Sequence, residues 1–86
     1  MKELDRIVLT TAVPGEDLES GDVGTVVHVY ADRKAYEVEF ITLDGKTAAV
    51  ATVEAANVRA IGPREITHAR ELAALSDADR YADVMR

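Results

Sequence analysis

Apolar and polar residues alternate with a period of two over the first two thirds of the chain. The clearest alternation lies at residues 35–42, where Tyr36, Val38 and Phe40 are separated by two glutamates. A period of two predicts a β-strand with one buried face and one wet face. Further strands are predicted at residues 4–10, 23–30, 46–53 and 58–61, with one short helical turn at 54–57.

Turn residues separate these strands. Asp44-Gly45 is a dipeptide that tight hairpins favour, because both central residues need positive φ. Gly24 stands inside the second strand, where a glycine predicts a bulge or a sharp bend. Leu18 is alone among acidic residues in the loop at 11–19, and we expect it to tuck beneath that loop. Five short strands with one hard bend are typical of a small β-barrel.

After Pro63 the apolar period changes from two to about 3.6. Ile66 and Leu72 fall on one helical face, and Pro63 is well placed as a first helical residue. Ser76 is a candidate cap for a second short helix. The pattern therefore divides the chain into a β-barrel at residues 1–62 and a C-terminal helical extension at 63–86.

Composition narrows the classes of function. The chain has 86 residues, a net charge of −6 and no cysteine. Its acidity disfavours binding to the phosphates of nucleic acid, and the missing cysteine excludes disulfides and thiolate metal sites. No apolar run is long enough to span a membrane, and the charged N-terminus lacks the apolar core of a signal peptide. We therefore expect a cytoplasmic protein.

The residues offer little catalytic or metal-binding chemistry. His28 could face Glu37 and Glu39 across two strands, but a surface histidine beside a solvated acidic face is the simpler interpretation. Glu37 and Glu39 have a spacing that glycosidase pairs use, yet so small a barrel has little room for a cleft. We therefore expect no catalytic residues, no metal and no cofactor.

The segments Leu-Asp-Arg-Ile-Val-Leu-Thr, Gly-Asp-Val-Gly-Thr-Val-Val-His-Val-Tyr and Tyr-Glu-Val-Glu-Phe resemble a family of short bacterial proteins known as a domain of unknown function. The resemblance covers about residues 3–61 and implies an SH3-like small barrel. The Gly-Asp-Val-Gly-Thr-Val segment is also similar, more loosely, to KOW-type ribosomal modules and to the barrel of the nitrile hydratase β subunit. Some members of such families look like antitoxins or immunity proteins.

Together these observations predict a mainly β protein, a five-stranded SH3-like barrel with a helical extension, that binds another protein without catalysis. Its partner would be a protein with a basic surface, such as a toxin, or a second copy of the chain in a homodimer. The alternative is an accessory or structural barrel subunit of a larger enzyme complex; an enzyme that uses Glu37 and Glu39 is a weaker third hypothesis. The predicted partner-binding residues are Glu16, Asp17, Glu19 and Tyr30 on the barrel, and Ile66, Leu72, Leu75, Tyr81 and Met85 on the extension.

Overall fold

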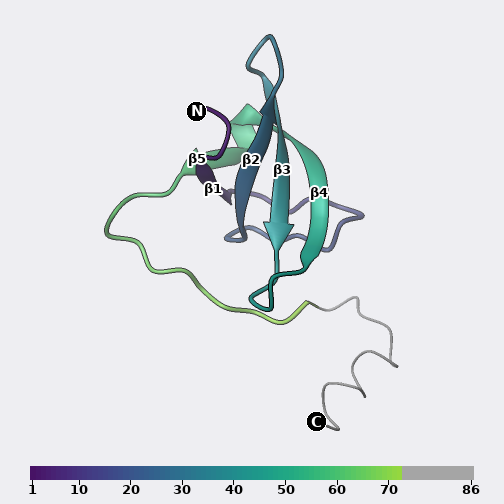
Figure 1. The fold of residues 1–86 in the computed structure, drawn as a ribbon, viewed down its shortest axis with the longest axis vertical. Coiled ribbons are helices and arrows are strands. Elements are labelled where there is room, and N and C mark those ends of the chain that lie inside the picture. Colours follow the sequence, from purple (N-terminus) through teal and green to yellow (C-terminus); the bar gives the residue numbers. More distant parts are fainter. Residues whose placement is uncertain (73–86) are drawn as a thin grey trace, which may run out of the picture.

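The computed structural model describes residues 1–72, and its strands form a single antiparallel sheet (Figure 1). The elements are β1 (Arg6–Leu9), β2 (Val23–Val29), β3 (Ala35–Ile41), β4 (Thr47–Glu54), the 3-10 turn η1 (Ala55–Asn57) and β5 (Val58–Ala60). Their order across the sheet is β4-β3-β2-β1-β5. All five strands expected from the alternation are present, so the mainly β prediction is confirmed.

The sheet is open rather than closed by hydrogen bonds. Within residues 1–72, β4 and β5 are the two edge strands, and no strand pairing joins them. The turn η1 connects these edges: Ala55 donates its N–H to Lys34 O, and Asn57 O accepts from the Thr10 N–H. Figure 1 shows β1 and β5 at a steep angle to β3 and β4, so the sheet curves around its apolar face.

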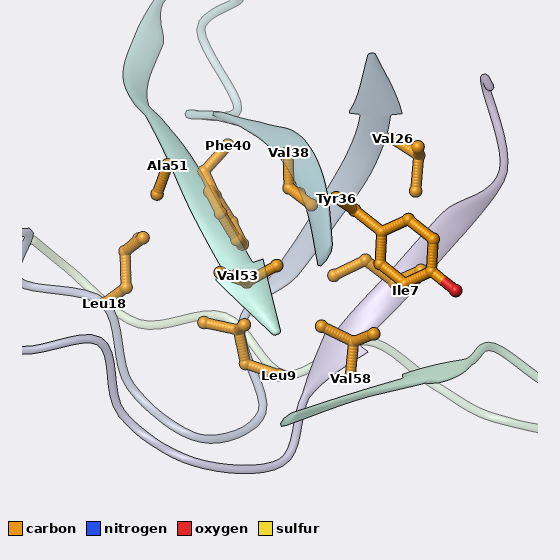
Figure 2. Close-up of a cluster of buried hydrophobic side chains, with 10 residues drawn as sticks. All are labelled: Ile7, Leu9, Leu18, Val26, Tyr36, Val38, Phe40, Ala51, Val53 and Val58. Carbon is orange, nitrogen blue, oxygen red and sulfur yellow. The ribbon is translucent and has the colours of Figure 1, made fainter. Parts of the chain in front are cut away.

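The core fills the inside of this curve (Figure 2). Tyr36, Val38 and Phe40 of β3 project into it with exposed fractions of 7%, 0% and 3%, as the alternation predicted. Leu18 is 4% exposed and joins the same cluster, so the loop at 11–19 is pinned to the core as expected. The other members are Ile7, Leu9, Val26, Ala51, Val53 and Val58.

Gly24 is needed because two core side chains lie directly over it. A Cβ at this position would stand 2.5 Å from Val38 Cγ1 and 2.8 Å from Phe40 Cε1. Both distances are shorter than any ordinary carbon contact, so a larger residue would have to displace β3 side chains. The glycine therefore permits close packing between β2 and β3, and it is paired regularly with Ile7 of β1.

The bulge of β2 lies three residues beyond the glycine that was predicted to mark it. Val26 pairs with Val38, and the next pair is His28 with Glu37, so Val27 is the additional residue. A bulge shifts the alternation of the strand by one residue. As a result Val26 and Val29 both pack on the core, whereas Val27 is 37% exposed.

The structure of the extension differs from the helix predicted from the sequence. Residues 63–72, predicted to begin a helix at Pro63, contain a turn at residues 63–64 and no regular secondary structure, and Figure 1 shows residues 61–72 as a strap leading away from β5. A short helix has little stability of its own, and the strap is instead held at both ends by arginine–carboxylate pairs described below. The second helix predicted after Ser76 lies outside the described residues.

Candidate functional site

The acidic loop, residues 11–19, is a compact turn whose charged side chains face solvent. The Val13 N–H donates to Leu18 O at 3.0 Å and closes the loop on itself. Asp17 has a left-handed φ of 56°, a conformation that aspartate tolerates better than most residues. Because Leu18 is buried and its neighbours are exposed, Asp17 and Glu19 present their polar groups on the outside of the loop.

Asp22 follows this loop and is oriented by its backbone. The Glu19 N–H donates to Asp22 Oδ2 at 2.8 Å, and the Asp22 N–H donates to Glu19 O at 3.1 Å. This reciprocal turn fixes the carboxylate at the start of β2, beside the acidic loop. The side chain is only 16% exposed, so its charge requires a partner.

Arg70 of the extension is that partner. Its Nε donates to Asp22 Oδ1 at 2.8 Å and its Nη2 to Asp22 Oδ2 at 2.6 Å, a two-bond fork. Nη2 also donates to Asp17 O at 2.7 Å, and Nη1 lies 3.2 Å from Glu19 Oε2. We call this group, Asp17, Glu19, Asp22 and Arg70, the guanidinium site.

The ionisation of the pair follows from this geometry. The hydrogen bonds from Arg70 hold the pKa of the Asp22 carboxyl below its usual value, against the opposing effect of partial burial. The same hydrogen bonds raise the pKa of the Arg70 guanidinium. Both groups are therefore charged at neutral pH, and the pair joins the extension to the turn before β2 over 48 positions of sequence.

A second pair holds the other end of the strap. Arg59 of β5 donates from Nη1 to Glu65 Oε2 at 2.8 Å, and its Nη2 lies 2.7 Å from Glu65 Oε1. The Gly62 N–H also donates to Glu65 Oε2, at 2.6 Å. The Arg59 hydrogen bonds, aided by Gly62, lower the pKa of Glu65 to about 2. An arginine–carboxylate pair therefore holds each end of the segment 65–70.

The structure brings together part of the predicted partner-binding set. Asp17 and Glu19 meet the extension through Arg70, so two surfaces predicted separately form one. Glu16 lies on the same loop and is exposed. On the extension, Ile66 is 94% exposed and Leu72 is half-buried, whereas Leu75, Tyr81 and Met85 lie outside the described residues.

Tyr30 belongs to a different surface, the outer face of β2, β3 and β4. Its hydroxyl donates to Glu37 Oε2 at 2.8 Å, and its ring meets His28 edge-on with centroids 4.8 Å apart. Glu37 also accepts hydrogen bonds from the Thr52 hydroxyl at 3.1 Å. Within residues 1–72, no cluster of three His, Cys, Asp or Glu side chains could hold a metal ion.

Sequence reasoning missed Asp22 and Arg70, the two central residues of the guanidinium site. Asp22 directly precedes the strand predicted at residues 23–30, and Arg70 lies within the helical extension predicted at 63–86. The available signal was the positive charge of Arg70 in an extension that follows an acidic β region. The charge alone does not identify the carboxylate that pairs with Arg70, because Glu16, Asp17, Glu19 and Asp22 could each do so.

A shallow hollow of about 210 Å³ adjoins the guanidinium site. Its lining combines carboxylates with small and apolar residues: Ala12, Val13, Pro14, Gly15, Asp17, Leu18 and Glu19. Apolar residues beside carboxylates suit a long basic side chain, whose aliphatic stem and charged head need different surroundings.

Comparison with known proteins finds a family and no characterised relative. The model of a family described as a domain of unknown function, DUF4926, matches residues 3–60. No curated protein and no solved structure matches the chain. Among the helices of residues 1–72, none has the length and apolar character needed to cross a membrane.

Proposed function

Because the chain belongs to the DUF4926 family, whose description states no function, we propose a function from the site itself. The protein is a non-catalytic, cytoplasmic binding module that masks a basic surface of another protein, in the manner of an antitoxin or immunity protein. The partner presents an arginine-bearing segment to the acidic loop and the strap beside it. The curved five-stranded sheet that carries this site is an SH3-like barrel.

The observation that carries the proposal is the binding of the Arg70 guanidinium by the barrel. One carboxylate fork, a second carboxylate and a backbone carbonyl surround this group. Such an arrangement recognises the planar donors of arginine better than the compact ammonium of lysine. The same chemistry on a partner would be recognised at the same rim.

The acidic loop keeps an excess of negative charge after Arg70 is bound. The loop and the residue before β2 carry four carboxylates, those of Glu16, Asp17, Glu19 and Asp22, of which Arg70 contacts the last two. The Glu19 side chain is still 63% exposed while it contacts Arg70. The surplus of negative charge attracts a basic partner and makes its association faster at low salt.

Affinity capture from extracts of the source cell tests the proposal. The bait is the full chain, and the captured protein is then purified and titrated against it. The charge-neutral loop variant carries Glu16→Gln, Asp17→Asn and Glu19→Gln. We expect this variant to lose most of the affinity, and we expect the wild-type affinity to fall as salt rises.

The matched control removes the same charge elsewhere. Glu3→Gln, Asp32→Asn and Asp44→Asn change three exposed carboxylates outside the acidic loop, and the last of these substitutions leaves an Asn-Gly dipeptide, which tight turns also favour. We expect this control to bind as the wild type does. If both triple variants lose affinity equally, the interaction depends on net charge and not on the acidic loop, and the proposal is wrong. Failure to capture any protein, or a captured protein that binds both variants as tightly as the wild type, would also overturn it.

A further inference from the structure

The strap is docked through a single side chain. Beyond Glu65, and among residues 1–72, all hydrogen bonds and ion pairs between the strap and the rest of the chain come from Arg70. Residues 66–69 are exposed and have no regular secondary structure, and Leu72 is half-buried. The docking of this segment therefore depends mainly on the binding of one guanidinium.

The Asp22 carboxylate has no room for a second fork while Arg70 is bound. Its Oδ1 accepts from Arg70 Nε, and its Oδ2 accepts from both Arg70 Nη2 at 2.6 Å and the Glu19 N–H at 2.8 Å. Each carboxylate oxygen offers about two acceptor positions, so Oδ2 is fully used. Another arginine can form the same two-bond fork only if Arg70 leaves.

The acceptors that surround Arg70 do not depend on the strap for their positions. They are Asp17 O, the Glu19 carboxylate and the Asp22 carboxylate, all within residues 17–22. The reciprocal hydrogen bonds between Glu19 and Asp22 fix this turn, and the Gly21 N–H donates to Leu9 O of β1 at 2.8 Å. A guanidinium from another molecule would therefore find the same acceptors once the strap has moved away.

We propose that Arg70 is an intramolecular competitor of the partner's arginine. The partner's guanidinium replaces that of Arg70 on Asp17 O, Glu19 and Asp22, and residues 66–72 are released from the acidic loop. This inference rests on the proposed function and adds that partner binding and strap release are coupled. Without a partner, Arg70 keeps the mostly buried Asp22 charge paired, which avoids the cost of burying it alone.

The competition distinguishes a basic surface from an isolated basic side chain. Arg70 is tethered close to the Arg59–Glu65 pair, and a short tether gives an effective concentration on the order of millimolar. A lone arginine at a lower concentration does not displace it. A partner that also contacts the exposed carboxylates of Glu16 and Glu19 gains further favourable pairs, and the exchange then becomes favourable.

NMR titration of the full chain with a tetra-arginine peptide tests the exchange. We expect this peptide to move the resonance of the Arg70 side-chain Nε–H to its undocked position, which the Asp22→Asn variant defines. A tetra-lysine peptide carries the same charge but forms no planar fork. At the same concentration it should displace Arg70 much less.

Two variants separate competition from charge. Arg70→Gln removes the competitor, and Arg64→Gln removes the same charge from an exposed position of the strap. We expect the affinity for tetra-arginine to rise about fivefold in Arg70→Gln, because the open site is then fully populated. In Arg64→Gln the rise should be less than about twofold.

The outcomes separate this inference from the proposed function. If tetra-arginine shifts the Glu16 and Asp17 amides while Arg70 stays docked, the ligand binds beside Arg70, and only this inference is wrong. Equal affinities of Arg70→Gln and Arg64→Gln would overturn the inference in the same way. If tetra-arginine binds neither the wild type nor Arg70→Gln, the site does not accept arginine from another molecule, and the proposed function is wrong as well.

Discussion

Arg70 and Asp22 form a two-bond fork in which Nε meets Oδ1 at 2.8 Å and Nη2 meets Oδ2 at 2.6 Å. The contact joins the strap, which contains Arg70, to the turn that precedes β2, which contains Asp22. Both side chains are mostly buried, with exposed fractions of 20% and 16%, so water weakens the pair less than it weakens an ordinary surface pair. The path of the strap therefore depends on one carboxylate.

Replacing that carboxylate should release the strap and leave the sheet intact. Asp22→Asn keeps an oxygen for the Glu19 N–H but removes the charge that holds Arg70, a loss on the order of 1 kcal/mol for the docked strap. We expect faster tryptic cleavage after Arg64 and Arg70, with little change in the unfolding midpoint. Asp44→Asn, at an exposed hairpin, is the control and should cleave like the wild type.

Acid should release the strap as well. The pKa of Asp22 is lowered in the folded protein by Arg70, and that of Glu65 is lowered from 4.5 to about 2 by Arg59. Depressed carboxyl pKa values stabilise the folded form at neutral pH, and this stabilisation is lost as pH falls through the folded-state values. We expect docking to be complete above about pH 4.5 and to weaken progressively towards pH 2.

The resonance of the Arg70 side-chain Nε–H, followed by NMR across this range, measures that release. In Asp22→Asn the resonance should already have its undocked position at neutral pH and should change little on acidification. A wild-type resonance that is constant from neutral pH to pH 2 would contradict the assignment of Asp22 as the anchor.

Leu18 should control the stability of the acidic loop. It is 4% exposed and packs in the core, whereas Leu43 is 98% exposed in the β3–β4 hairpin. We expect Leu18→Ala to lower the free energy of unfolding by about 2–4 kcal/mol, and Leu43→Ala to change it by less than about 0.5 kcal/mol. Urea unfolding followed by circular dichroism compares the two, and equal effects would show that Leu18 does not pin the loop.

Gly24 should tolerate no side chain. The methyl group of Gly24→Ala would meet Val38 Cγ1 at 2.5 Å, and we expect this overpacking to lower the free energy of unfolding by about 1–3 kcal/mol. Val27→Ala alters an exposed residue of the same strand and should cost about 0.5 kcal/mol or less. Urea unfolding provides the measurement, and a Gly24→Ala variant as stable as the wild type would contradict the contact.

The strands were predictable because their signal is local. Tyr36, Val38 and Phe40 indicate one buried face by their spacing alone, and Asp44-Gly45 marks the hairpin that follows. The position of the bulge was not predictable, because it depends on how β2 meets β3. Gly24 is a glycine on account of Val38 and Phe40 above it, which the sequence of β2 by itself does not reveal.

The extension was harder for the same physical reason. The spacing of Ile66 and Leu72 fits a helix, but a weak local preference yields to stronger contacts made elsewhere. Here those contacts are Arg59 with Glu65 and Arg70 with Asp22. The acidic loop could be proposed as a binding surface from its composition, whereas its occupation by Arg70 joins residues 48 positions apart.

Because of the bulge at Val27, the number of residues in β2 is constrained as well as their type. Val26 and Val29 both face the core although they are three positions apart, since the additional residue between them absorbs one step of the alternation. Deleting Val27 would give a more regular strand, but it would also shift every later residue of β2 by one pairing position against β3 or shorten the hairpin that follows. A relative that lacks this residue must therefore change the β2–β3 hairpin too, so insertions and deletions at these two places should occur together.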